Sequence, residues 1–261
     1  MAANYGLLGE HLSHSYSKQI HEALADYTYD LIELSKEGLK EFMTAKDFAA
    51  VNVTIPYKRD VIPYLDELDE RAKSIGAVNT VVNRNGKLFG YNTDYYGFLY
   101  TLKIHNIKIT GEKVIVLGNG GAAQAVLAVL RDLSAKEIVI VDIVPGDGVC
   151  TYEEVNRLHT DATVLVNTSP IGMYPKVDAA PIDLTPFTKL TAVVDVIYNP
   201  EVTKLLAQAK SRGLIAVNGL QMLVSQAFYA VQHFLDTTLE EAKIEEVTQM
   251  IRESCTKSAN N

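Results

Sequence analysis

Cysteine is scarce in this sequence. Of its 261 residues only Cys150 and Cys255 are cysteines, and neither lies in a CxxC or Cys/His spacing. Metal sites and redox pairs usually bring such ligands close together along the chain. The six histidines also lack metal-ligand partners at a diagnostic spacing. We therefore expect two free thiols in a reducing environment and no metal site.

The sequence has no excess of positive charge. Its formal net charge is -8 and its pI is near 5.3. An acidic surface repels nucleic acids and anionic membranes, so neither is expected as a partner. An anionic small molecule would have to be held by local donors.

Long hydrophobic runs are missing as well. The most apolar stretch, residues 114–130, is interrupted by Asn119, three glycines and Gln124, and it is too short to span a bilayer. The segment MAANYGLLGE lacks the basic start and the apolar stretch of a secretory signal. These features predict a cytoplasmic protein.

The first part of the chain, up to about Gly97, alternates short apolar runs with helical patterns. This alternation predicts an α/β domain with parallel strand pairing. The expected strands are residues 5–8, 29–34 and 50–54, and the expected helix is 17–24. Hydrophobic residues make up 48% of the whole chain, enough to form a substantial core in one or two domains.

The middle part, from about Lys113, contains continuous apolar runs of the kind found in strands that are covered on both faces. The expected strands are residues 114–117, 138–141, 163–166 and 192–196, and the expected helices are 122–133 and 202–212. This pattern predicts a Rossmann-type, doubly wound parallel sheet. Beyond Gly219 the periodicity is helical, and these last helices are expected to pack back on the first part.

A glycine-rich turn of the GxGxxA type directly follows the first strand of the middle part. Gly118 permits a tight turn, Gly120 allows the backbone to approach a pyrophosphate, and Ala123 allows close packing of helix on strand. The start of the following helix, Gly121 and Ala122, adds amide donors and the positive end of the helix dipole. The strand before the turn and the helix after it favour a dinucleotide site.

The second strand of the middle part ends at Asp142, 24 residues after Gly118. A carboxylate at this place can accept hydrogen bonds from a ribose 2′-hydroxyl, which favours NAD over NADP. The following residues, Ile143 to Gly146, offer no cation for a 2′-phosphate. The alternative is that Asp142 only begins a turn.

Lys58 and Asp94 are candidates for acid–base chemistry. Pro56 ends an apolar strand, so Lys58 is carried at its exit from the sheet, and Asp94 lies between Gly90 and Gly97 in a polar turn that can begin a helix. Hydride reduction of a ketone needs a proton donor, and a lysine beside a carboxylate can serve. Taken singly, Lys58 could be solvated and Asp94 could cap a helix.

Thr54 and Asn79 are polar residues within otherwise apolar runs. Such residues are costly to bury unless they are hydrogen-bonded. They could donate to a hydroxylated substrate, or they could satisfy the end of the sheet internally.

Together these motifs resemble the shikimate dehydrogenase family along nearly the whole chain. The matching segments are HSYS (14–17), VNVTIPYK (51–58), IGAVNT (75–80), GYNTD (90–94), NTSPIGM (167–173), DVIYNP (195–200) and GLQMLVSQA (219–227). The resemblance implies a substrate-binding α/β domain of residues 1–97 with 224–261, a Rossmann domain of residues 98–223, and an active site in the cleft. It also implies nicotinamide-dependent interconversion of 3-dehydroshikimate and shikimate in aromatic amino acid biosynthesis.

The same resemblance implies roles for single residues. Lys58 is the catalytic acid and base, Asp94 is its partner, and Ser15 and Ser17 hold the substrate carboxylate. The other implied substrate contacts are Thr54, Asn79, Tyr198 and Gln226, and the other implied cofactor contacts are Thr168, Gly219 and Met222.

Two departures from the family pattern affect these expectations. Lys18 stands where the family usually has proline after its two serines. NADP-dependent members commonly have Asn-Arg-Thr after the second Rossmann strand, whereas this chain has Asp142, Ile143 and Val144. NAD is therefore slightly favoured and NADP stays open.

Two further functions are kept as alternatives. A quinate or mixed quinate/shikimate dehydrogenase agrees with Asp142, whereas the serines at positions 15 and 17 favour shikimate. A catalytically silent ligand sensor on the same scaffold would not need Lys58 and Asp94. Both a monomer and a homodimer are compatible with the sequence, because an apolar helical stripe is more often core than interface.

Overall fold

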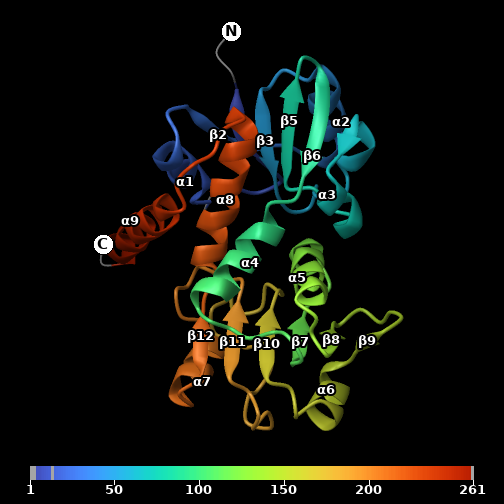
Figure 1. Ribbon diagram of the computed structural model, residues 1–261, viewed down its shortest axis with the longest axis vertical. Coiled ribbons are helices and arrows are strands. Elements are labelled where there is room, and N and C mark those ends of the chain that lie inside the picture. Colours follow the sequence, from blue (N-terminus) through green and yellow to red (C-terminus); the bar gives the residue numbers. More distant parts are fainter. Residues whose placement is uncertain (1–3, 13–14, 260–261) are drawn as a thin grey trace. The chain divides into compact units, whose positions relative to one another are not determined.

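The computed structural model describes residues 4–12 and 15–259, with the backbone alone at 255–259 (Figure 1). The motif residue His14 and the thiol of Cys255 lie outside the described residues. The chain divides into two compact units: residues 1–97 with 223–261, and residues 98–222. Each unit is built around one sheet of six strands.

The first unit holds a mixed sheet with the strand order β2-β1-β3-β5-β6-β4. Its strands are β1 (Tyr5–Gly9), β2 (Tyr29–Glu33), β3 (Ala50–Val53), β4 (Glu67–Leu68), β5 (Thr80–Arg84) and β6 (Lys87–Tyr91). Its helices are α1 (Ser17–Leu24), α2 (Lys36–Ala45), the 3-10 turn η1 (Ile62–Tyr64), α3 (Glu70–Ile75) and α9 (Ala242–Ala259). The unit boundaries fall within α4 (Asp94–Ile104) and α8 (Leu220–Leu235).

The strands predicted at 5–8, 29–34 and 50–54 pair in parallel as expected, β1 with β2 and β1 with β3. The sheet as a whole is nevertheless mixed, because β5 runs antiparallel to both β3 and β6. The two-residue turn Asn85–Gly86 joins β5 to β6, and both of its residues have positive φ, 55° and 85°. Asn-Gly is the sequence that such a tight hairpin turn prefers. The hairpin could therefore have been predicted from these two residues.

This mixed topology brings four chain segments together along one edge of the sheet, the edge at which β1, β3 and β6 end and β5 begins. The parallel strands β1 and β3 both end there. Because β5 is antiparallel to β3, it begins there, and β6 ends there in turn. The segments that carry Ser15, Lys58, Asn79 and Asp94 are therefore all attached to this edge.

Helices cover both faces of the first sheet. On one face, side chains of α2 and α3 such as Met43 and Ala72 pack with Val51 and Val81 of the strands. On the other face, Ala230 and Phe234 of α8 pack with strand residues that include Leu7. Helix α9 contacts α1, so the C-terminal helices belong to the first unit, as the helical periodicity predicts.

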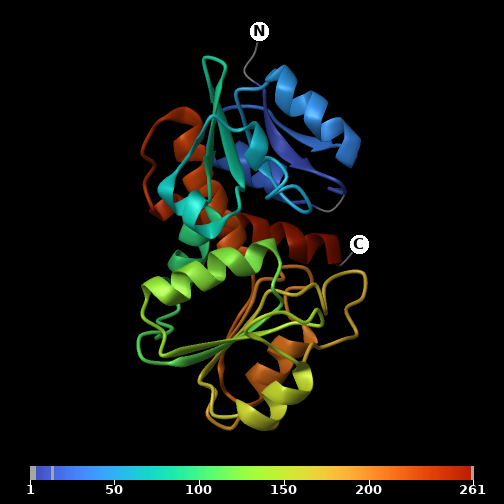
Figure 2. The same cartoon turned by 90° about the vertical axis from the view of Figure 1, so that its right-hand side faces the viewer.

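The second unit holds an all-parallel sheet with the strand order β12-β11-β10-β7-β8-β9. Its strands are β7 (Lys113–Leu117), β8 (Glu137–Val141), β9 (Val149–Cys150), β10 (Val164–Asn167), β11 (Ala192–Asp195) and β12 (Ile215–Val217). Helix α5 (Gly121–Asp132) covers one face, and α6 (Tyr152–Leu158) and α7 (Lys204–Ser211) cover the opposite face (Figure 2). The Rossmann-type doubly wound prediction is confirmed.

Apolar side chains in register form the core of this second sheet. Ile115, Leu165 and Val193 are aligned across three neighbouring strands, and all three are fully buried. They pack against Leu205 and Leu206 of α7 on one face. A strand that is covered on both faces has to be apolar along its whole length, which explains the continuous runs in the sequence.

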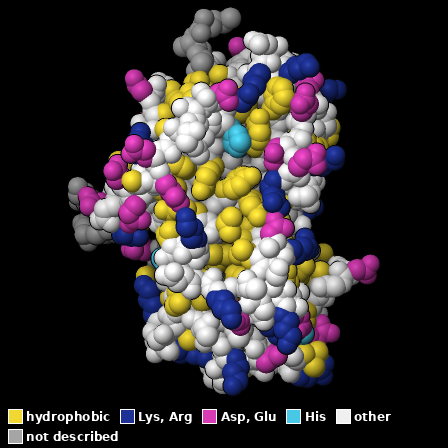
Figure 3. Space-filling model, in the orientation of Figure 1, with side chains coloured by type: hydrophobic (Ala, Val, Ile, Leu, Met, Phe, Trp, Pro, Cys, Tyr) yellow, Lys and Arg dark blue, Asp and Glu magenta, His cyan; other side chains and the backbone are white. Residues whose placement is uncertain are grey.

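The surface carries charges of both signs. Figure 3 shows Lys and Arg side chains interspersed with Asp and Glu side chains on the displayed face. None of the helices within the described ranges has both the length and the low polarity that a bilayer crossing requires.

Candidate active site

Lys58 and Asp94 form an ion pair in the first unit. Lys58 lies five residues after the end of β3, and its Nζ donates a hydrogen bond to Oδ2 of Asp94, the first residue of α4. Only 14% of the lysine side chain and 9% of the aspartate side chain are exposed. Lys58 is therefore not a freely solvated surface lysine, and the pair can exchange a proton with a molecule bound beside it.

The start of α4 leaves the carboxylate of Asp94 available for this pair. The backbone N–H of Tyr95 donates to Oδ1 of Asn92 at 3.3 Å, so Asn92 supplies a capping bond. The amide of Asn92 is itself held by the carbonyl of Ala77 at 2.9 Å. A carboxylate in the first turn of a helix is also stabilised by the helix dipole.

Asn79 holds the second oxygen of Asp94. Its Nδ2 donates to Asp94 Oδ1 at 2.9 Å and to Thr93 Oγ1 at 3.0 Å. Its Oδ1 accepts from the Thr93 backbone N–H at 2.7 Å. Asn79 is only 2% exposed, so its amide is already engaged by the protein. The structure thus places it as a support of Asp94, and a substrate hydroxyl would have to compete for its hydrogen bonds.

Gln226 reaches the same cluster from α8. Its Oε1 lies 3.3 Å from Nδ2 of Asn79, and its own Nε2 donates to the carbonyl of Leu223 at 2.8 Å. Residues that are 147 positions apart in the sequence are therefore joined. The structure brings together Lys58, Asn79, Asp94 and Gln226.

A buried polar chain continues from Asn79 into the interior, and sequence reasoning missed it. Thr80 Oγ1 donates to Asn79 Oδ1 at 3.0 Å, and Asn52 Nδ2 lies 3.1 Å from Thr80 Oγ1. Asn52 Oδ1 accepts from the hydroxyl of Tyr29 at 2.8 Å. Burial raises the pKa of Tyr29 well above its usual value, so its hydroxyl stays protonated as a donor. The signal was Asn52, a polar residue between two valines of a strand.

The predicted carboxylate-binding serines lie on the segment that follows β1. Ser17 begins α1 and is 6% exposed, and its backbone N–H donates to Oγ of Ser15 at 3.2 Å. Thr54 directly follows β3, and its N–H donates to the carbonyl of Leu8 at 2.9 Å. A Cβ added at Gly9 would lie 2.8 Å from Thr54 Cγ2. Thr54 therefore lies against the end of β1, from which the serine segment starts.

The glycine turn of the second unit has the geometry of a dinucleotide site. Gly118 has φ +94°, and an added Cβ would meet Thr168 Oγ1 at 2.9 Å. Thr168 braces this turn, because its hydroxyl donates to the Leu117 carbonyl at 2.8 Å. Gly120 precedes α5 without a side-chain cap, and nothing lies within 4 Å of an added Cβ there. The first amides of α5 can thus meet a pyrophosphate.

Asp142 lies beside this turn, at the end of β8. Its Oδ2 accepts from the backbone N–H of Asn119 at 2.7 Å, and its Oδ1 accepts from the N–H of Val144 at 2.9 Å. The carboxylate thus links the turn to the loop that follows β8. A nicotinamide dinucleotide fits the turn and the start of α5 as they stand.

The remaining predicted contacts, Tyr198, Gly219 and Met222, also belong to the second unit. The N–H of Gly219 donates to the carbonyl of Ile197 at 2.9 Å, and an added Cβ would lie 1.9 Å from the carbonyl oxygen of Val196. Only glycine can therefore hold this close approach beside Tyr198.

Sequence reasoning also missed a buried polar group at the ends of β10 and β11. Asp195 Oδ1 accepts from Asn167 Nδ2 at 3.0 Å, and Oδ2 accepts from Thr203 Oγ1 at 2.7 Å. Burial raises the pKa of Asp195 to about 6. The two residues are paired in register at the carboxyl end of the sheet. The signal was a polar residue at the end of each apolar run.

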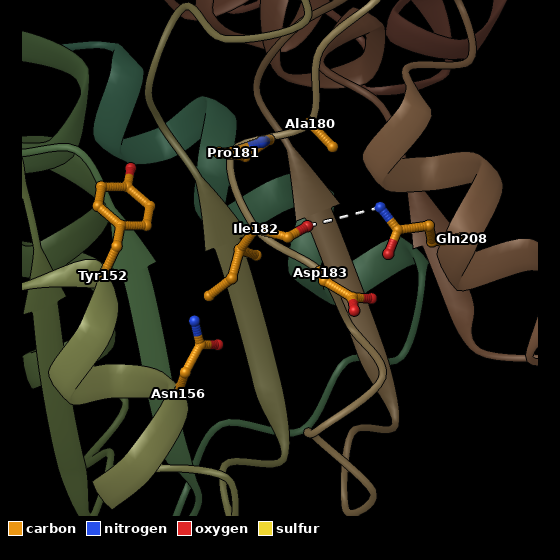
Figure 4. Close-up of a pocket in the computed structure, with 7 residues that line it drawn as sticks. All are labelled: Tyr152, Asn156, Ala180, Pro181, Ile182, Asp183 and Gln208. Atoms are coloured by element: carbon orange, nitrogen blue, oxygen red, sulfur yellow. Dashed lines mark hydrogen bonds between the residues drawn. The ribbon is translucent and has the colours of Figure 1, made fainter.

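A pocket of about 510 Å³ lies elsewhere in the second unit (Figure 4). It is lined by Tyr152, Asn156, Ala180, Pro181, Ile182, Asp183 and Gln208. Gln208 braces its wall, because its Oε1 accepts from the Leu184 N–H at 2.9 Å. None of these lining residues is a predicted site residue, so this pocket is distinct from the groups above. Across the described residues, no group of His, Cys, Asp or Glu side chains could hold a metal ion.

Known proteins are similar to this chain along most of its length. The model of the shikimate dehydrogenase substrate binding domain matches residues 7–81. The Shikimate dehydrogenase (NADP(+)) of Clostridium beijerinckii is 41% identical over 253 residues, which cover 90% of this chain and 93% of that protein. The chain belongs to the shikimate dehydrogenase family.

Two solved structures of shikimate 5-dehydrogenases contain different dinucleotides. The enzyme from Thermus thermophilus, in complex with NADP(H) and shikimate, has a TM-score of 0.84 and 30% identity and covers 95% of this chain and 99% of that one. The enzyme from Listeria monocytogenes, in complex with shikimate and NAD, has a TM-score of 0.80 and 27% identity and covers 95% of this chain and 96% of that one.

Proposed function

We propose that this chain is a shikimate dehydrogenase that interconverts 3-dehydroshikimate and shikimate with a nicotinamide dinucleotide. The observation that carries the proposal is the shielded ion pair of Lys58 and Asp94, with Asn79 on the other carboxylate oxygen. Curated relatives of similar length carry this activity in their names. The proposal also assigns the roles of the site residues.

Lys58 is the proton donor for ketone reduction. A bound reduced nicotinamide supplies the hydride to the carbonyl carbon, and the carbonyl oxygen becomes an alkoxide that needs a proton. The ammonium of Lys58 donates that proton, and in the reverse direction its neutral amine accepts the proton of the hydroxyl. Asp94 orients Nζ by a charge-assisted hydrogen bond, and Asn79 keeps the carboxylate in place.

The substrate contacts are assigned to the same sheet edge. Ser15 and Ser17 take the substrate carboxylate, which they can bind with hydroxyl and backbone donors. Thr54, Asn79 and Gln226 are assigned to the ring hydroxyls, and Tyr198 is assigned as a further substrate contact. A substrate hydroxyl in this place would exchange hydrogen bonds with Asn79, whose amide is shared among several partners.

The cofactor contacts are assigned to the second unit. The backbone of Gly118 to Ala123 takes the pyrophosphate, Thr168 braces the turn, and Asp142 lies at the ribose. Gly219 and Met222 lie at the nicotinamide. With these roles, residues 1–97 with 224–261 form the substrate-binding domain and residues 98–223 form the dinucleotide-binding domain.

The test compares two lysine variants of the same unit. Lys58→Ala is expected to keep shikimate binding and to lower kcat by roughly 10²- to 10⁴-fold, because one general acid is removed. The control is Lys46→Ala, since Lys46 forms an exposed ion pair with Asp66 at 3.1 Å. Calorimetric shikimate binding and initial rates measure both properties.

The proposal fails if Lys58→Ala turns over shikimate as fast as the parent protein, or if it loses binding while each bound molecule reacts unchanged. Quinate is assayed in parallel, and a clear preference for it would replace shikimate as the substrate. Tight shikimate binding without turnover by the parent protein would indicate the ligand sensor.

A further inference from the structure

The loop after β8 carries a carboxylate at the place where a dinucleotide exposes its adenosine ribose. We propose that Asp142 and the segment that follows it select NAD and reject NADP, although the curated relatives are named for NADP(+). This inference rests on the proposed function and specifies its cofactor.

Two backbone hydrogen bonds hold the Asp142 carboxylate at the glycine turn. One oxygen accepts from Asn119 at 2.7 Å and the other accepts from Val144 at 2.9 Å. Each carboxylate oxygen can accept a further hydrogen bond, so a ribose diol can still donate to both. A 2′-phosphate would bring a second anion to the same oxygens, and like charges at this range repel.

The loop offers nothing to neutralise a 2′-phosphate. From Asp142 to Asn156 the chain contains no lysine or arginine, whereas Asp147, Glu153 and Glu154 add negative charge. Before Asp142 in the sequence, the nearest basic residues are Arg131 and Lys136. Arg131 lies at the end of α5 and Lys136 directly precedes β8, so both lie near the start of β8, whereas Asp142 follows its end. A dinucleotide phosphate at Asp142 would therefore find acceptors where it needs donors.

The same loop has an apolar surface that suits an uncharged adenosine. Ile143 is 81% exposed and Val144 is 66% exposed, directly beside the carboxylate. These two adjacent side chains form a small apolar surface on the loop. An adenine ring that lies on them would bury both while its ribose hydroxyls reach Asp142.

The loop is held on the sheet at both ends, so it cannot easily turn its carboxylate away. Strand β9 pairs with β8 through Val149 and Cys150. The N–H of Asp142 donates to the carbonyl of Cys150 at 3.3 Å, and the N–H of Val149 donates to the carbonyl of Gly146 at 3.0 Å. The connection contains residues 142–148 and no helix.

The experiment titrates the protein with NADH and with NADPH and follows the fluorescence of the nicotinamide. The parent protein is expected to bind NADH at least roughly tenfold more tightly, the effect of about one uncompensated charge contact. Asp142→Asn should reduce the difference between the two dissociation constants, mainly because NADPH binds more tightly to the variant. Asp147→Asn is the matched control, because it removes one negative charge from the same loop outside the proposed contact.

A second variant covers the possibility that Asp142→Asn loses the loop conformation. Val144→Arg places a cation beside the carboxylate and should raise the affinity for NADPH relative to the affinity for NADH. Tighter NADPH than NADH binding by the parent protein overturns the inference, and so does an equal effect of Asp142→Asn and Asp147→Asn.

Initial rates with shikimate separate this inference from the proposed function. Turnover with NADP at least as good as with NAD overturns only the cofactor choice. Absence of turnover with either dinucleotide overturns the proposed function, whatever the ratio of the two binding constants.

Discussion

The two sheets of this protein place polar side chains differently. In the first unit, Asn52 lies inside β3, is 3% exposed and donates a hydrogen bond to Thr80 at the start of β5. In the second unit, the strand interiors are apolar, and Asn167 and Asp195 lie at strand ends. The core of the first unit therefore contains hydrogen-bonded polar side chains, whereas in the second unit such side chains lie at the strand ends.

This difference corresponds to two ways of preparing a site. The first unit orients a lysine and a carboxylate, and hydrogen bonds from neighbouring polar side chains hold the carboxylate in place. The second unit offers backbone amides of a turn and a helix start, which need glycine and an apolar strand behind them. Under the proposed function, the mixed sheet serves proton transfer and the parallel sheet serves dinucleotide binding, each by different chemistry.

A large loss of stability is expected when a polar residue is placed in the apolar sheet. Leu165 is fully buried in β10 between β7 and β11. Leu165→Asn should lower the free energy of unfolding by about 4 kcal/mol, because it removes packed methyl groups and buries an amide without partners. Urea unfolding measures it. A loss below about 1 kcal/mol would show that the second sheet tolerates polar groups as the first one does.

The next effect concerns Asp195 and pH. Its pKa is raised by burial from 3.8 to about 6, so between these values the folded chain binds a proton that the unfolded chain has lost. The free energy of unfolding should therefore fall as pH rises from about 4 to about 6, by about 3 kcal/mol in all. Asp195→Asn should remove this fall. A variant with the same slope in urea unfolding would exclude Asp195 as its source.

The polar chain of the first unit is tested by Asn52→Leu. The change leaves the Tyr29 hydroxyl without its acceptor and removes the hydrogen bonds that Asn52 donates to the Asn79 carbonyl and to Thr80 Oγ1. We therefore expect about 2 kcal/mol lower stability and a lower kcat, because Asn79, which supports Asp94, is held less firmly. The control is Asn83→Leu in β5, because Asn83 donates to the carbonyls of Lys46 and Phe48. Equal losses of kcat in both variants would mean that the chain acts only through stability.

His21 should give the first unit the opposite response to pH. Burial lowers its pKa from 6.5 to about 3, so below pH 6.5 the unfolded chain binds a proton that the folded chain refuses. The free energy of unfolding should therefore fall as the pH drops, by about 1.4 kcal/mol per pH unit. His21→Phe should make the free energy of unfolding less dependent on pH. Amide hydrogen exchange, measured as a function of pH in β1 and β3 and separately in β10 and β11, assigns each pH dependence of stability to its unit. If the stability of both units changed with pH in the same direction, the contrast between the two units would be wrong.

The predictable parts of the fold are those with a local physical cause. The apolar runs indicated the parallel sheet, and the strand before Gly118 indicated the turn that α5 follows. Asn85–Gly86 was equally readable and would have revealed the antiparallel hairpin. The hydrogen-bonded series from Tyr29 through Asn52 to Asn79 was not readable, because its members come from different parts of the sheet and meet only through the order and register of the strands.

The sequence by itself determined the hydrophobic periodicity of the strands and helices, the glycines at turns that require them, and the charge of the loop after β8. These features depend only on neighbouring residues. The tertiary structure alone decided that Lys58, Asn79, Asp94 and Gln226 meet. Their meeting depends on strand order and direction, which are set by the burial of whole faces and by no single segment.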